Sequence, residues 1–271
     1  MFKSMYKTCE HPDRKIGEAV LNVKGVIVAL IIYLLSNSVL LYGMSYLIGW
    51  VNGSFGTNFG NAELNVAYQL ITIALMILFL GRFYWENLKA FFKEFKAVYI
   101  WAPIVCYIMI FVGNIAATML LSLIRGEMQT STSNNDTVNA LMLQNPIPMI
   151  LVAVVFAPIL EETIFRGALS RSMTSSKNYF VKALGFVIPV FLFALLHVYQ
   201  YAFFGTDANG AVYLTFNADE FLSIISYIPM GIGFTLCSYL CKNFWGSVAC
   251  HILNNGIAMA MMILMSMLNL A

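Results

Sequence analysis

Charged residues are scarce in this chain. Of its 271 residues, only 10% are Asp, Glu, Lys or Arg, whereas 60% are hydrophobic. A soluble domain carries roughly 25% charged residues, so this composition excludes an ordinary soluble protein. The formal net charge of +2 at pH 7 offers no strongly basic surface, and we expect no nucleic-acid partner.

Disulfide and zinc-finger frameworks are also lacking. The five cysteines are an odd number, and most lie within apolar runs, which predicts small reduced core residues. Cys237 and Cys241 are one helical turn apart, but no spacing typical of a zinc site accompanies them. A cleavable signal peptide is not expected either, because the apolar stretch after residue 24 is too long for one.

Long apolar runs are what the chain has in abundance. Seven are long enough to cross a bilayer as helices. They cover residues 24–51, 64–84, 98–124, 147–169, 181–204, 221–241 and 244–270. The sequence therefore predicts an all-α, polytopic transmembrane helix bundle of about seven spans, with six to eight as the limits, and a short extra helix near 137–146.

The segment 86–96 between the second and third runs is amphipathic. Its apolar residues recur at helical spacing, opposite its lysines. The apolar residues are Leu88, Phe91, Phe92 and Phe95, and the lysines are Lys89, Lys93 and Lys96. The pattern favours a basic helix on the membrane surface, with a plain basic loop as the alternative.

The basic residues are distributed unevenly between the two sides of the predicted bundle. If the N-terminus is cytoplasmic, every Lys and Arg except Arg125 lies on or toward the inner side. Acidic residues dominate the opposite loops. This positive-inside pattern predicts an integral membrane protein with a cytoplasmic N-terminus, and the compact chain suggests the bacterial plasma membrane.

Ionisable groups occur inside the spans only after the Ser-, Thr- and Asn-rich loop that ends near residue 139. We therefore divide the chain into an accessory region, 1–140, and a catalytic region, 141–271. The accessory region contains three transmembrane helices and the basic surface helix. Since an ionised side chain near the bilayer centre costs about 3 kcal/mol, such groups indicate a functional site.

Five ionisable side chains lie in the spans of the catalytic region. The fourth span carries Glu161, Glu162 and Arg166, the fifth His197 and the seventh His251. At 1.5 Å rise per residue, the three spans place their groups at similar depth. We measure this depth along each helix from a basic residue at its predicted inner end. The distances are about 15 Å from Arg171 to Glu161, about 22 Å from Lys182 to His197 and about 14 Å from Lys242 to His251. We expect these groups to converge in one pocket.

The two glutamates are expected to play different roles. Adjacent helical residues diverge by about 100°, so Glu161 and Glu162 face different directions. Glu162 and Arg166 are four residues apart and predict an ion pair that fixes the helix. Pro158, one turn earlier, removes a backbone hydrogen bond, and a kink there would aim Glu161 and admit water.

This set of residues suits the activation of water. A carboxylate in a low-dielectric pocket can take a proton from water, and a histidine can orient that water. His251 and Asn255, one turn apart, can supply two donors to an oxyanion. Alternatively, Glu161, His197 and His251 hold one divalent metal such as zinc, or each histidine makes only an interhelical hydrogen bond.

Three short motifs resemble those of a known family. Glu161-Glu162-Thr-Ile-Phe-Arg166, Phe193-Ala-Leu-Leu-His197 and His251-Ile-Leu-Asn-Asn255 resemble the Glu-Glu-x-x-x-Arg, Phe-x-x-x-His and His-x-x-x-Asn motifs of the CPBP (Abi) family. That family includes type II CAAX prenyl endopeptidases and bacteriocin-processing and immunity proteins. The resemblance covers roughly residues 145–262.

The resemblance implies an intramembrane endopeptidase, of the metalloprotease or the glutamate type, acting on a hydrophobic or lipidated peptide or protein at the bilayer. It implies that Glu161 and His197 activate water and that His251 and Asn255 stabilise the oxyanion. Glu162, Arg166 and Phe193 would support this geometry. The alternatives are a non-catalytic protein for bacteriocin self-immunity or partner binding, and a proton-conducting transporter. Inverted repeats, which favour a transporter, are not found in the sequence.

Overall fold

The architecture is that of a membrane-spanning helix bundle. A computed structural model describes residues 5–10, 17–128, 131–207 and 211–268. Within these residues, seven helices are long and apolar enough to cross a membrane, which confirms the predicted all-α bundle. The candidate spans are Val23–Phe55, Asn61–Lys93, Val98–Arg125, Pro146–Thr174, Tyr179–Phe203, Ala218–Cys241 and Phe244–Met267.

Several spans are built from more than one helical element. The first joins α1 (Val23–Leu35), the π-helical segment η2 (Ser36–Leu40) and α2 (Leu41–Phe55). The second and third are α3 (Asn61–Lys93) and α4 (Val98–Arg125). The fourth joins α6 (Pro146–Ile150), η3 (Leu151–Phe156), α7 (Ala157–Glu162), η4 (Thr163–Ser170) and α8 (Arg171–Thr174). The last three are α9 (Tyr179–Phe203), α10 (Ala218–Leu222) with α11 (Ile224–Cys241), and α12 (Phe244–Met267).

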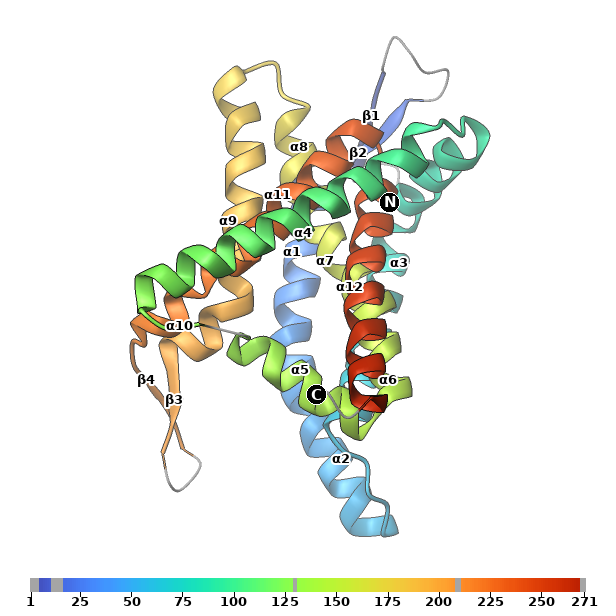
Figure 1. Ribbon diagram of the computed structural model, residues 1–271. Helices are drawn as coiled ribbons and strands as arrows, with labels where there is room; N and C mark the ends of the chain where they lie inside the picture. The colour runs from blue at the N-terminus through green and yellow to red at the C-terminus, as the bar shows by residue number, and fades with distance from the viewer. Residues whose placement is uncertain (1–4, 11–16, 129–130, 208–210, 269–271) are drawn as a thin grey trace.

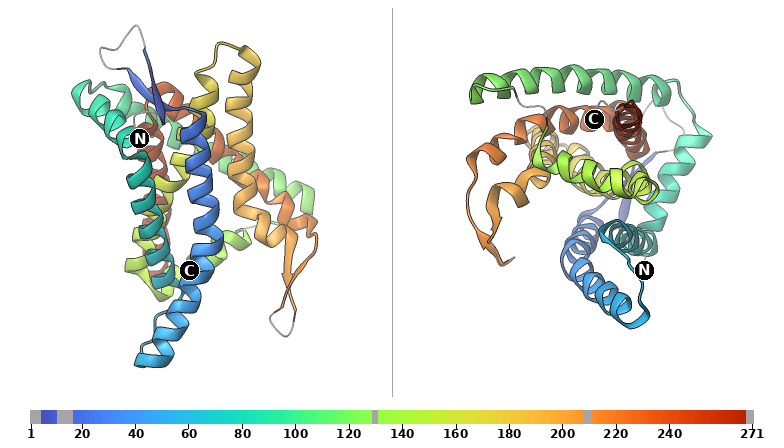
Figure 2. Two further views of the ribbon diagram at one scale, coloured as in Figure 1. Left: turned by 180° about the vertical axis from the view of Figure 1, so that it is seen from behind. Right: turned by 60° about the horizontal axis from the view of Figure 1, so that its bottom comes forward.

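The spans are arranged around the fourth one (Figures 1 and 2). α4 runs obliquely across one face, where it packs on α11 and α12, and α1 and α3 lie on the other side. α2 projects beyond the rest of the bundle and has no buried residue. Regions 1–140 and 141–271 thus pack into one bundle, since α1 contacts η4 and α3 contacts α7. The boundary at residue 140 stays a prediction.

Close helix packing depends on small residues in α11. A Cβ at Gly233 would lie 2.3 Å from a side-chain carbon of Ile110 on α4. A Cβ at Gly231 would lie 3.1 Å from the carbonyl oxygen of Val190 on α9. In a bilayer, small residues of this kind let helices approach closely enough for van der Waals contact and hydrogen bonding. α11 is therefore held tightly between α4 and α9.

The outside of the bundle is apolar and its inside holds polar groups. On α4, for example, the exposed side chains are Ile104, Ile108, Phe111, Val112 and Ile115. Buried side chains include Glu162, Arg166 and His251. This arrangement is typical of a protein whose solvent is lipid, since charged groups must turn away from the hydrocarbon.

Four of the five free cysteines are buried, as predicted. They come together where α4, α11 and α12 cross, and the Cys237 thiol contacts those of Cys106, Cys241 and Cys250. The thiol of Cys250 also donates to the carbonyl of Pro103, at 3.5 Å. In this cluster they act as small core residues that fill a helix crossing.

An N-terminal hairpin closes one end of the bundle, and the sequence did not predict it. β1 (Tyr6–Cys9) pairs antiparallel with β2 (Glu18–Leu21), and β2 is completely buried. The Asn87 amide donates to the carbonyl of Ala19 at 2.9 Å, and the Glu18 carboxylate pairs with Arg171. Strands of four residues whose partners lie on distant helices leave no local periodicity to detect. A second hairpin joins β3 (Phe204–Thr206) to β4 (Val212–Leu214).

Two further helical expectations are tested by the structure. Segment 86–93 is helical, but as the uninterrupted end of α3 and not as a separate helix or a loop. Its position on a membrane surface stays a prediction. The short extra helix exists as α5 (Ser133–Gln144). It begins earlier than expected because the Thr132 hydroxyl caps it, accepting from the backbone N–H of Asn135 at 3.3 Å.

Candidate active site

The glutamate motif lies on an irregular helix. The π-helical segments η3 and η4 flank the single α-helical stretch Ala157–Glu162, and Pro158 lies near the start of that stretch. Proline has no N–H to donate, and π-helical turns frequently occur at functional sites because they redirect side chains. The irregular geometry thus coincides with the glutamates, whereas the kink that Pro158 suggests stays a prediction.

Glu162 and Arg166 form the predicted ion pair. Both side chains are fully buried, and Arg166 Nη1 lies 2.8 Å from Glu162 Oε1. Arg166 Nη2 donates to the carbonyl of Gly231 on α11 at 2.9 Å. Its guanidinium also lies 4.8 Å from the ring centre of Phe193 and 5.2 Å from that of Phe234. Arg166 is therefore held by hydrogen bonds and by the faces of aromatic rings.

His251 joins this pair from the seventh span. Its Nδ1 lies 2.9 Å from Glu162 Oε1, the same oxygen that accepts from Arg166. Its ring stacks on Phe234, with centroids 4.2 Å apart and planes at 18°. Because an ionised carboxylate only accepts hydrogen bonds, His251 Nδ1 is the donor and Nε2 is left for other contacts.

His197 reaches the same centre through Phe193. Its Nδ1 lies 2.7 Å from the carbonyl oxygen of Phe193, which only accepts, so Nε2 is again the remaining ring nitrogen. The Phe193 ring lies 4.5 Å from the His197 ring and 6.0 Å from the His251 ring. The buried Phe193 thus contacts both histidines and the Arg166 guanidinium, consistent with the support that the motif assigns to it.

Glu161 differs from Glu162 in its hydrogen bonds. It makes none of Glu162's hydrogen bonds, and its Oε2 atom is buried without a hydrogen-bond partner among the described residues. Its carboxylate is close enough to His251 for their charges to interact. In the part of the chain that the structure describes, no hydrogen bond links Glu161 directly to His197.

Two tyrosines that sequence reasoning missed lie near Glu161, and a third lies near both of them. The phenol groups of Tyr33 on α1 and Tyr68 on α3 lie within electrostatic range of the Glu161 carboxylate, and both lie within range of Tyr199 on α9. Two of them come from the region expected to be accessory. No spacing along the chain connects residues on three separate spans, so the sequence offered no signal for this group.

Asn255 makes contacts that its expected role did not include. Its Nδ2 donates to the carbonyl of Ala153 in η3 at 2.8 Å, and its Oδ1 accepts from Asn254 at 3.0 Å. A side-chain amide carries two hydrogens, so one remains for another acceptor. Asn255 therefore ties α12 to the π-helical part of the fourth span, close to His251.

The three residues that the sequence offers as metal ligands do not form a metal-binding group as they lie. Among the described residues, no three His, Cys, Asp or Glu side chains are grouped so as to hold an ion. The Nδ1 atoms of His197 and His251 are bound to Phe193 and Glu162, so Nε2 is the nitrogen of each ring that a metal would use. Binding of a divalent metal by Glu161, His197 and His251 stays a prediction that chelation tests.

The geometry defines a membrane-embedded protein with a buried polar centre contributed by three spans. Residues 143–257 match the family described as type II CAAX prenyl endopeptidase Rce1-like. This match contains all three motifs and confirms the resemblance that they carry. It supports a protease of the CAAX-processing type within the membrane. No curated protein and no solved structure matches the chain.

Proposed function

We propose that the protein is an intramembrane endopeptidase in which a water activated by Glu161 hydrolyses a peptide bond. The substrate is a hydrophobic, membrane-associated or lipidated peptide or protein. One observation carries this proposal: Glu162 Oε1 accepts from both Arg166 and His251, so that motifs from the fourth and seventh spans meet in one buried centre. Phe193 adds the fifth span to the same centre.

Glu161 is the proposed general base. Its carboxylate is buried beside His251, and its Oε2 has no partner among the described residues; unlike Glu162, it is not held by Arg166, so it is free to accept a proton from water. As the water oxygen bonds to the carbonyl carbon, the proton passes to Glu161. The same proton then goes to the leaving amine when the C–N bond breaks. His197 Nε2, with its lone pair, accepts a hydrogen of the water and orients it.

His251 is the proposed oxyanion donor, on a charge argument. Glu161 and Glu162 carry two negative charges when ionised, whereas Arg166 supplies one positive charge. Buried charges need compensation, and a proton on His251 provides it. A protonated His251 donates from Nδ1 to Glu162 and presents Nε2–H to the carbonyl oxygen on which negative charge develops. The remaining hydrogen of the Asn255 amide is a second donor.

The orientation follows from the positive-inside rule. The basic ends of α3, α9 and α11 lie at the end of the bundle that carries the β1–β2 hairpin, as the alternating spans require. Cytoplasmic loops carry an excess of Lys and Arg, so we assign this end to the cytoplasmic side of a bacterial plasma membrane.

Cleavage of defined peptides by the purified protein tests the proposal. Prenylated CAAX peptides and unmodified hydrophobic peptides are presented in proteoliposomes to wild type, Glu161→Gln and Glu86→Gln. Glu86 is a matched control because it pairs with Lys89 on the surface of α3. We expect Glu161→Gln to lower kcat/KM by a factor of about 10² to 10⁴, the usual contribution of a general base, and Glu86→Gln to behave as wild type. A fully active Glu161→Gln would refute the assignment.

A further inference from the structure

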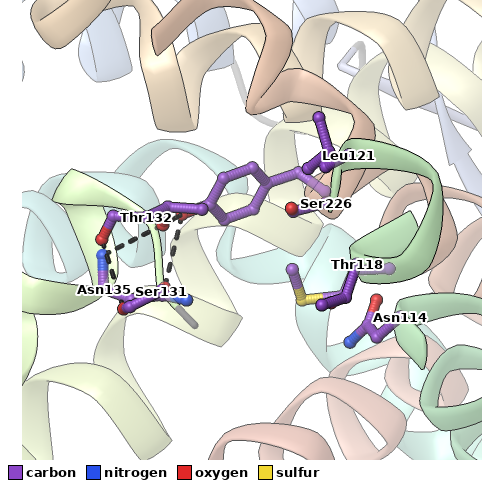
Figure 3. A pocket seen from close by; sticks show the side chains of 9 residues that line it. Asn114, Thr118, Leu121, Ser131, Thr132, Asn135 and Ser226 are labelled. Atoms are coloured by element: carbon purple, nitrogen blue, oxygen red, sulfur yellow. Dashed lines mark hydrogen bonds between the residues drawn. The ribbon is translucent and has the colours of Figure 1, made fainter. Parts of the chain in front are cut away.

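A polar cavity lies between α4, α5 and α11, outside the motif residues (Figure 3). Its volume is about 120 Å³. The lining residues on which its chemistry depends are Asn114 and Thr118 of α4, Thr132 and Asn135 beside or on α5, and Ser226 and Tyr227 of α11. Hydroxyl and amide groups dominate this lining, and no lining side chain carries a charge.

The chemistry of the cavity suits water. Hydroxyl and amide groups donate and accept hydrogen bonds equally well. The Oδ1 atom of Asn114 is buried and has no hydrogen-bond partner among the described residues, which costs free energy unless water supplies one. One water needs roughly 10 to 15 Å³ of such volume, so the cavity has room for several.

Tyr227 separates the cavity from His197. Its side chain is buried, and its ring stacks on the His197 ring with centroids 4.6 Å apart and planes at 26°. Its hydroxyl lies 2.6 Å from the Thr132 hydroxyl and donates to Asn135 Oδ1 at 3.3 Å. One side chain thus faces the proposed catalytic histidine and also belongs to the hydrogen-bond network of the cavity.

Met230 forms a second part of the same partition. It lines the cavity, and its sulfur accepts from Asn254 Nδ2 at 3.7 Å. Asn254 in turn donates to Asn255, the last residue of the third motif. The cavity is therefore connected to His197 of the second motif through one side chain, Tyr227, and to Asn255 of the third motif through two, Met230 and Asn254.

Hydrolysis consumes one water for every peptide bond. The aromatic rings around the motif residues provide few hydrogen-bonding groups that could hold such water. We infer that the cavity is a water chamber that supplies the hydrolytic water to His197, with Tyr227 as the partition between them. This inference rests on the proposed protease function. It makes Tyr227 a positioning residue, which holds the His197 ring by stacking and the chamber network by its hydroxyl.

Thiol labelling tests for the chamber independently of activity. In a Cys9→Ser background, Thr118→Cys and Ser226→Cys are exposed to a small charged methanethiosulfonate in proteoliposomes. The control is Ile115→Cys, because Ile115 is exposed on the lipid-facing side of α4. We expect labelling at positions 118 and 226 and none at 115. Because Thr118 is an exposed residue and Ser226 is not, position 226 is decisive, and absence of labelling there would overturn the chamber, whatever the enzyme does.

Kinetics test whether the chamber supplies the reaction. Filling it by Thr118→Leu with Ser226→Leu should lower kcat by about tenfold with KM unchanged, whereas Ile115→Leu should change neither. Tyr227→Phe keeps the stacking and loses only the hydroxyl, so it should lower kcat less than Tyr227→Leu does. A raised KM with unchanged kcat would instead indicate a peptide-binding subsite, and an unchanged kcat and KM would overturn the supply of water. A failure of the proposed protease function would show separately, as full activity of the Glu161→Gln variant.

Discussion

Two buried carboxylate–arginine pairs take their arginine from the fourth span, and they differ in their surroundings. Glu162 pairs with Arg166 within the span, and Glu18 of the N-terminal hairpin pairs with Arg171 a little further along. Arg171 binds Glu18 with both Nε and Nη2, a two-pronged contact that uses both carboxylate oxygens. Glu162, by contrast, shares one oxygen between Arg166 and His251.

We interpret the hairpin pair as a structural ion pair and the central pair as part of the proposed active site. The Glu18–Arg171 contact fastens a strand to the end of the bundle. Around Glu162–Arg166, an additional carboxylate, Glu161, and a histidine are left over. A buried pair contributes little net stability, so its value lies in what it positions. The hairpin pair positions backbone, and the central pair positions His251.

The largest effect is expected from breaking the central pair. Arg166→Met leaves Glu162 buried without its guanidinium, which should lower the free energy of unfolding by about 3–5 kcal/mol. It should also abolish cleavage. Thermal unfolding in detergent and peptide cleavage measure the two effects.

A double variant sharpens this test. Glu162→Gln combined with Arg166→Met removes both charges, so it should recover most of the stability that Arg166→Met loses, without recovering activity. A double variant that regains activity would show that the central pair is only structural, like the pair at the hairpin.

A smaller effect is expected at the hairpin. Glu18→Gln leaves Arg171 with a neutral acceptor, and we expect a loss of about 1–3 kcal/mol in the free energy of unfolding. Activity per folded molecule should remain within about twofold, because this pair lies at the end of the bundle that carries the hairpin, beyond the motif residues of the fourth span. A hundredfold loss of kcat in a stable Glu18→Gln would contradict the comparison between the two pairs.

The fold was largely predictable because the bilayer imposes it. Long apolar runs have to become helices in lipid, where every backbone group must be bonded internally. The hairpin was missed because its buried pair joins residues 153 positions apart, and no periodicity marks such a contact. The π-helical segments on both sides of α7 were likewise invisible, since Pro158 indicates only a kink.

The central site was predictable as a set of residues but not as a network. Depth and motif order brought Glu162, Arg166 and His251 together correctly. Which oxygen His251 binds, and the use of Nδ1 by both histidines, depend on side-chain rotamers that no spacing encodes. The tyrosines around Glu161 and the stacking of Tyr227 on His197 arise from packing between distant spans and had no sequence signal.

A still smaller effect is expected from Asn255→Ala. The change removes the hydrogen bond to the Ala153 carbonyl and one proposed oxyanion donor, each worth about 1 kcal/mol. We expect kcat to fall by about tenfold with little change in KM, and thermal stability to fall slightly. Asn254→Ala is a matched control, because Asn254 contacts Met230 and Asn255 but not the fourth span. Equal losses in the two variants would argue against a distinct role for Asn255.

Chelation should have the smallest effect. The expectation rests on the grouping of the candidate ligands, because among the described residues no three His, Cys, Asp or Glu side chains lie together around an ion, although Nε2 of His197 and of His251 stays available. A divalent-metal chelator should therefore leave kcat/KM within about twofold of its starting value. Dialysis against the chelator, followed by the peptide assay with and without added zinc, measures this. Activity that disappears and returns only with zinc would mean that Glu161, His197 and His251 turn toward a shared ion. The central cluster would then be a metal site and not a glutamate-activated one, while the comparison with the hairpin pair would still hold.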